Sequence, residues 1–141
     1  MYTFEIITAG SDVAGNLLNA GAVPNPFTFT TAAGATATAT GPIGGPSTVA
    51  AITITYTWTG TPTSVNLYYT TNGGAAWTSC GATDATVDGN YAFTCPTAGT
   101  YGWIASAVGG GSVELSPPTG GTPPEAASYI YDNVAPTITA T

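Results

Sequence analysis

The chain has 141 residues, of which 43% are hydrophobic and seven are acidic, and it contains no Lys, Arg or His. A net charge of −7 without one basic side chain excludes nucleic acid as a partner, because binding to phosphates requires cations that displace counterions. Attraction to an anionic lipid surface is excluded for the same reason. Side-chain ion pairs cannot form either, so we expect acid to harm the fold little.

The first third of the chain contains short alternating runs separated by glycine-rich sequence. Residues 2–8 place Tyr2, Phe4 and Ile6 on one face of a predicted strand, and residues 10–26 follow as a tether rich in Gly and Asn. Residues 27–31 and 35–40 then alternate strictly. The second of these runs has only methyl groups on its inner face, which suits an edge strand.

The remaining chain continues with period-two runs and turn signals, and no helical period is seen. Residues 49–59 form the strongest predicted strand, and Asn72-Gly73-Gly74 is a hairpin signal. Further strands are predicted at residues 65–71, 76–80, 91–95, 100–108, 113–115 and 128–131. This pattern predicts an all-β protein, an Ig-like antiparallel β-sandwich with extended terminal strands. The predicted domains are an N-terminal extension (1–25), the sandwich (26–135) and an extended tail (136–141).

Two cysteines, Cys80 and Cys95, lie at the ends of predicted neighbouring strands. Their even number and their spacing predict an intrachain disulfide. The alternative is a pair of small buried thiols. A disulfide would place the protein outside the cytosol.

Three segments carry a family resemblance. Residues 67–77 (LYYTTNGGAAW), 88–93 (DGNYAF) and 99–107 (GTYGWIASA) resemble prokaryotic surface Ig-like domains, and residues 132–137 (DNVAPT) resemble the junction between two such domains. The resemblance covers about residues 48–140, and it implies fold and cell-surface placement but no activity. In overall character the chain is similar to subunits of prokaryotic filaments or tubes, such as archaeal threads, bundling pili and cannulae. In several such systems one subunit donates a terminal strand to its neighbour.

Catalysis is not expected, because the chain has no His as a base and no Lys or Arg to stabilise an anion. We therefore predict that the protein is not an enzyme and has no organic cofactor. The acidic residues could instead bind Ca²⁺, which takes oxygen ligands. The candidate ligands are Asp84, Asp88 and Asn90 in one loop, and Asp132 with Glu114 or Glu125. The alternatives are an ordinary Asx turn for the first group and a solvated linker for the second.

The three tryptophans could in principle form a platform for sugar stacking. Trp58 and Trp103 lie in alternating strands, so they are predicted to be core residues, and Trp77 is the one expected to be exposed.

The leading functional hypothesis is a structural subunit of an extracellular filament or tube, a homopolymer of identical subunits joined by donor-strand exchange. The predicted donor strand is residues 2–8, with Tyr2, Phe4 and Ile6 inserted into the neighbour, and the tail at residues 136–140 is its rival. The alternatives are an Ig-like adhesin or surface-layer module of a longer exported protein, or a carbohydrate-binding module that binds glycans. Insertion into a membrane is not expected, because no segment approaches the length of a membrane span.

Overall fold

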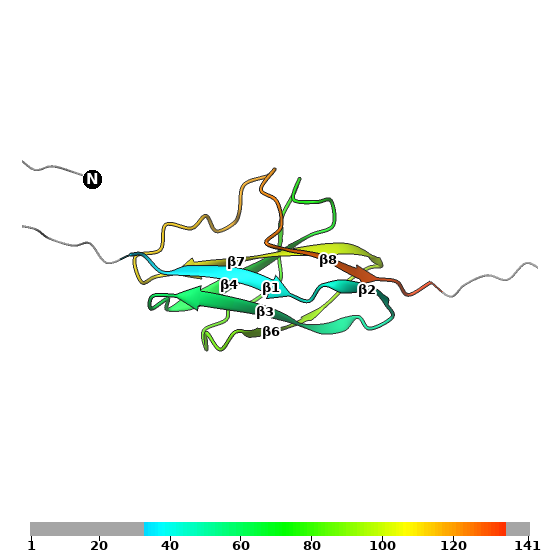
Figure 1. The fold of residues 1–141 in the computed structure, drawn as a ribbon, viewed down its shortest axis with the longest axis horizontal. Coiled ribbons are helices and arrows are strands. Elements are labelled where there is room, and N and C mark those ends of the chain that lie inside the picture. Colours follow the sequence, from blue (N-terminus) through cyan, green and yellow to red (C-terminus); the bar gives the residue numbers. More distant parts are fainter. Residues whose placement is uncertain (1–32, 135–141) are drawn as a thin grey trace, which may run out of the picture. The chain divides into compact units, whose positions relative to one another are not determined.

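The computed structural model describes residues 33–134, which form strands and connecting turns without a helix (Figure 1). The protein is therefore all-β in this part of the chain, as predicted. The strands are β1 (Thr36–Gly41), β2 (Gly44–Ser47), β3 (Ala51–Thr59), β4 (Ser64–Thr70), β5 (Thr78–Ser79), β6 (Asn90–Thr94), β7 (Gly99–Val108) and β8 (Ala126–Tyr131).

The strands form two sheets that pack face to face as a β-sandwich. One sheet has the order β1-β3-β6, and the other has the order β2-β8-β7-β4-β5. All pairs are antiparallel except β2 with β8. The chain changes sheets between β1 and β2, across Pro42 and Ile43. The predicted β-sandwich is thus confirmed.

The core lies between the two sheets and is filled by alternate side chains. Ile54 and Tyr56 contribute from β3, and Tyr101 and Trp103 contribute from β7 with no exposed surface of their own. The Trp103 ring lies parallel to the Tyr101 ring at 5.6 Å and meets Phe93 edge-on at 5.4 Å. Its indole N–H donates to the Pro42 carbonyl at 3.0 Å, so this central Trp is also satisfied as a polar group.

The strand β7 is buried on both faces, because the β7–β8 loop folds back over the outside of its sheet (Figure 1). Ser116 of this loop bonds to Asn66 and Tyr68 on β4, and a Cβ added at Gly102 would lie 2.6 Å from Pro124. Only Gly therefore permits this close approach of the loop to the sheet.

The turn into β7 is fixed by a side-chain hydrogen bond. The Tyr101 hydroxyl donates to the Thr97 carbonyl at 2.6 Å and accepts the Thr97 N–H at 3.3 Å. A Tyr at the start of a strand that bonds back across the preceding corner is the arrangement known as a tyrosine corner. These two hydrogen bonds fix the β6–β7 connection, which passes from one sheet to the other, against the start of β7.

The predicted donor residues Tyr2, Phe4 and Ile6 lie outside the described residues, and so do the rival tail (136–140) and the predicted domain boundary at residue 26.

Candidate functional site

The loop predicted to bind calcium is organised by the buried carboxylate of Asp84. Its Oδ1 accepts the Thr86 N–H, the Thr86 hydroxyl and the Val87 N–H, and its Oδ2 accepts the Tyr56 hydroxyl. Its main chain bridges to Val65 of β4 in both directions. Burial acts to raise the pKa of Asp84, but the hydrogen bonds from Thr86, Tyr56 and Val87 outweigh it and hold the pKa below its ordinary value. Both oxygens are thus engaged within the protein.

The other predicted calcium ligands make local turns. Asp88 accepts the Asn90 N–H at 2.9 Å, and the side chain of Asn90 donates to the Asp88 carbonyl. Asp132 follows β8 and accepts the Val134 N–H. Between residues 33 and 134, no group of three or more His, Cys, Asp or Glu side chains is arranged to hold a metal ion. The geometry favours the Asx-turn alternative, and calcium binding stays a prediction.

Cys80 and Cys95 lie on the same side of the sandwich and are both free thiols in the structure. Burial raises the pKa of Cys80 to about 12, and charge on the neighbouring Cys95 adds to the shift. Burial also raises the pKa of Cys95. Cys80 thus lies beside the five-stranded sheet, directly after β5, and Cys95 lies at the end of β6. Both thiols are protonated at neutral pH, because their pKa values are raised.

We expect the protein recovered from an oxidising environment to contain a disulfide between Cys80 and Cys95. The bond would close a loop of about 15 residues, which contributes roughly 3 kcal/mol by loop-closure entropy. Intact mass should then rise by two hydrogens on reduction. Alkylation must be done after unfolding, because a raised pKa alone protects a buried thiol from the reagent. Two thiols alkylated in unreduced, unfolded protein would exclude the disulfide.

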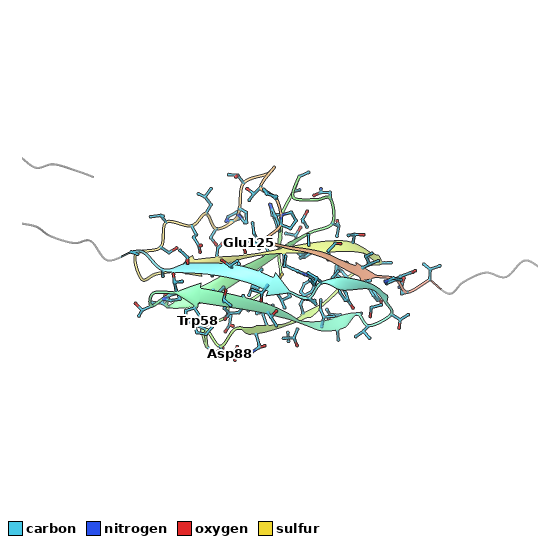
Figure 2. All side chains as sticks on the ribbon, in the orientation of Figure 1. Trp58, Asp88 and Glu125 are labelled. Carbon is cyan, nitrogen blue, oxygen red and sulfur yellow. The ribbon has the colours of Figure 1, made fainter. Side chains whose placement is uncertain are left out.

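The three tryptophans have different environments, and sugar stacking on them stays a prediction. Trp103 is in the core, as predicted, but the prediction of a core position for Trp58 is wrong, because its side chain is 42% exposed. Trp58 lies beside Asp88 on the β3–β6 side of the molecule (Figure 2), and its only aromatic neighbour in the described range is Tyr56 at 6.0 Å. Trp77 is half-buried, and its indole N–H has no hydrogen-bond partner among residues 33–134. Alternation fixes the face of a strand, but it does not fix how far the core extends along it.

The described sandwich has four edge strands, and three of them are protected against pairing with another chain. The edge of β2 contains Pro46, which has no N–H to offer, and β5 is only two residues long. The outer N–H groups of Ala37 and Ala39 in β1 are occupied by the carboxylates of Glu114 and Glu125. At the fourth edge, β6, a carboxylate occupies only the first outer N–H, that of Asn90, which the Asp88 side chain accepts.

The free hydrogen-bonding groups of β6 follow from its register. The N–H of Cys95 donates to the Ala50 carbonyl, and the N–H of Tyr56 donates to the Gly89 carbonyl. In an antiparallel ladder, bonded and non-bonded pairs alternate, so the backbone groups of residues 91 and 93 also point toward β3. Those of residues 90, 92 and 94 point outward along a strand without Pro, Gly or a charged side chain. The Asp88 carboxylate accepts the Asn90 N–H, whereas the N–H groups of Ala92 and Thr94 have no partner among the described residues.

The core is incompletely covered beside this edge. Tyr91 and Phe93 of β6 point inward from it and remain partly exposed, and the Tyr91 hydroxyl lies 3.5 Å from the Cys80 carbonyl across the opening. The hydrophobic side chains that are only partly buried against the core include several on this side, namely Ile52, Tyr69, Cys80, Val87, Tyr91 and Phe93. The open β6 edge is therefore lined by apolar groups that an added strand would cover.

Sequence patterns miss two features that shape these edges. The predicted strand at residues 113–115 is wrong, because these residues form no strand and Glu114 instead bonds to two other strands. Glu125 is predicted only as a calcium ligand, and the structure shows it bonded to strand N–H groups. The useful signal is that each is a lone carboxylate in a Gly- and Pro-rich loop, in a chain that has no cation to pair with it.

No helix in the described range is long and apolar enough to cross a membrane. Comparisons of the chain with protein-family models, with curated proteins and with solved structures find no match.

Proposed function

We propose that the protein is a structural subunit of an extracellular filament or tube, which polymerises by donor-strand exchange into the β6 edge. The observation that carries the proposal is the β6 edge, which among the four edges of the described sandwich leaves two successive outer N–H groups, those of Ala92 and Thr94, without a partner in residues 33–134. Soluble β proteins protect their edges, because an unpaired row of N–H and C=O groups is a template for another strand. An edge left open beside a partly exposed core is suited to strand addition.

The N-terminal run has the properties that such a site requires. Tyr2, Phe4 and Ile6 alternate with Thr3 and Glu5, so an inserted strand would place three large side chains toward the core and polar ones toward water. Burial of each large side chain contributes roughly 1.5–3 kcal/mol. The 24 residues between Thr8 and Ala33 could span up to about 80 Å, at roughly 3.3 Å per residue. This tether is long enough to reach an adjacent subunit.

An extracellular setting is supported by three features. The predicted disulfide would form only under oxidising conditions. A chain without Lys or Arg offers no site to trypsin-like proteases. The tyrosine corner at Tyr101 and the change of sheet between β1 and β2 resemble features of Ig-type sandwiches, which are common at cell surfaces.

Deleting residues 1–9 is expected to give a soluble, folded monomer that no longer polymerises. A synthetic peptide of residues 2–8 should bind this monomer and protect the N–H groups of Ala92 and Thr94 from exchange. Electron microscopy and light scattering measure the assembly. A chain that lacks residues 136–141 is the control, and it should still assemble. Normal assembly of the 1–9 deletion would show that the N-terminus is not the donor.

The second candidate is an Ig-like adhesin or surface-layer module of a longer exported protein. It is favoured by residues 132–137, which resemble a domain junction. In that case the intact chain stays monomeric at high concentration, with or without residues 1–9. The same measurements therefore separate the two candidates.

A further inference from the structure

Glu114, in the β7–β8 loop, connects two strands that belong to different sheets. Its carboxylate accepts the N–H of Ala37 in β1 at 3.1 and 3.2 Å, and the N–H of Ala107 in β7 at 2.6 Å. The seam between β1 and β7 is where the two sheets approach each other on the side opposite β6. Glu114 thus supplies acceptors at positions where a neighbouring strand would place its carbonyls.

Glu125 repeats this arrangement two residues later in β1 and two residues earlier in β7. Its Oε2 accepts the N–H of Ala39 at 2.7 Å and the N–H of Ala105 at 3.0 Å. Figure 2 shows Glu125 beside β1, away from Trp58 and Asp88. We name Glu114, Glu125 and the four N–H groups that they accept the carboxylate clasp.

The clasp is held in position by the main chain around it. The N–H of Glu125 donates to the Trp103 carbonyl at 3.0 Å. The hydroxyl of Ser106 donates to the Leu115 carbonyl at 2.9 Å, and the N–H of Glu114 donates to the Ser112 hydroxyl at 3.2 Å. The loop between the two carboxylates contains Pro117, Pro118, Pro123 and Pro124. The main chain at both glutamates is therefore restrained, which lowers the entropy lost in placing their carboxylates.

The strands beneath the clasp have the properties of an edge that pairs readily. The strand β1 reads TATATG and alternates without a charge. The N–H of Ala35, the residue before β1, donates to the Gly110 carbonyl. The outer N–H groups of Ala35, Ala37 and Ala39 are thus each occupied by an acceptor outside any strand. The strand β8 begins opposite Trp103, so β7 has no strand partner on this side beyond that residue. Without the two carboxylates, both strands would offer unpaired backbone groups.

We infer that the β1–β7 seam is a latent strand-binding site that the carboxylate clasp holds shut, and that its occupant after loss of the clasp is the β1 edge of a second copy. An antiparallel β1–β1 pair is self-complementary, because each strand presents the same Thr and Ala alternation to the other. The β1–β1 pair also brings no charged side chains together, because β1 contains none, although the whole chain carries a net charge of −7. The clasp therefore directs strand addition away from β1, whatever strand is accepted at β6.

The two carboxylates of the clasp carry like charges and repel each other. Partial burial raises the pKa of Glu125, the neighbouring Glu114 carboxylate adds to the rise, and the N–H groups of Ala105 and Ala39 reduce it. The other acidic residues of the described chain are engaged in separate turns, and the sequence supplies no basic group. A neutral acceptor of the same shape should therefore hold the seam as well as Glu does.

The test compares the full-length pair E114A/E125A with its isosteric control E114Q/E125Q. Amide hydrogen exchange, read by NMR, should be at least about tenfold faster at Ala37, Ala39, Ala105 and Ala107 in the alanine pair. The glutamine pair should keep its protection, because at each glutamate one oxygen, Oε2, accepts from both strands, and a side-chain amide oxygen can take its place. E125A alone should expose Ala39 and Ala105 and leave Ala37 and Ala107 protected. This single variant keeps the test informative if the double variant unfolds.

The occupant is tested with a synthetic peptide of residues 35–41 and by sedimentation. The peptide should bind the alanine pair, restore protection at Ala37 and Ala39, and bind neither the natural chain nor the glutamine pair. The alanine pair should also form an additional self-associated species that excess peptide dissolves. Unchanged exchange at the four amides, or an exposed seam that binds no peptide, would overturn the inference. Both readouts are independent of residues 2–8, so they remain decisive if donor-strand exchange fails its own test.

Discussion

A proline at position 92 is expected to abolish polymerisation while leaving the sandwich folded. The N–H of Ala92 points away from β3, so its removal breaks no hydrogen bond within the subunit. It does remove a donor in the middle of the β6 edge, and the proline ring blocks the approach of another strand. The concentration needed for assembly should rise more than tenfold, which corresponds to about 1.4 kcal/mol or more per joint.

Two matched variants control this experiment. Ala92→Thr keeps the N–H and suits a strand, so it should assemble normally. Phe93→Pro removes an N–H that points toward β3, and it should unfold the sheet instead. Assembly of the Ala92→Pro variant at the normal concentration would exclude β6 as the acceptor edge, and the filament could then still form through another surface.

Asp84→Ala is expected to lower the free energy of unfolding by about 3–4 kcal/mol. The substitution leaves the buried Tyr56 hydroxyl and the N–H groups of Thr86 and Val87 without their acceptor, and each such group costs about 1–3 kcal/mol. Val87 also has a φ of 51°, which is unfavourable for a β-branched residue. The hydrogen bond from its N–H to Asp84 helps to hold this backbone conformation. Urea unfolding measures the loss.

Asp84→Asn separates the charge from the shape, because it retains an acceptor for Thr86 and Val87. It should be less destabilising at pH 7 and should remove part of the pH dependence. The folded pKa of Asp84 is lowered, so its stabilisation is present above the unfolded value near 3.9 and is lost as the pH falls through the folded value. An Asp84→Asn variant whose stability follows pH as the natural chain does would contradict this role.

The pH dependence that Glu125 contributes to stability has the opposite sign to that of Asp84. Its folded pKa is raised, so its contribution is present below the unfolded value near 4.3 and is lost as the pH rises through the folded value. The expectation of acid tolerance rests on the absence of ion pairs. Carboxylates that accept backbone N–H groups make stability depend on pH in a way that ion-pair reasoning does not include. The pKa shifts of Asp84 and Glu125 have opposite directions, so acid removes the contribution of Asp84 and restores that of Glu125.

Local patterns in the sequence are sufficient for most of the strands and for the all-β class of the fold. The alternation of Ile54 and Tyr56 with threonines, and the glycine-rich turns, depend on neighbours within a few residues, and these are physical constraints that a single sequence displays. The turn at Asp88 and Asn90 is local in the same sense. The absence of Lys, Arg and His is a property of composition, so the predictions that the chain binds no nucleic acid and is not an enzyme do not depend on the fold.

The tertiary structure alone decided which strand edges are open and what closes the others. Glu114 is 77 residues from Ala37 in sequence, and Glu125 is 86 residues from Ala39, so no local pattern relates them. The exposure of Trp58 and the engagement of Asp84 by Tyr56 likewise depend on where separate strands meet. Periodicity fixes the face of a strand, whereas strand order and register fix its neighbours. An edge can therefore be recognised as open or protected only after the sheets have assembled.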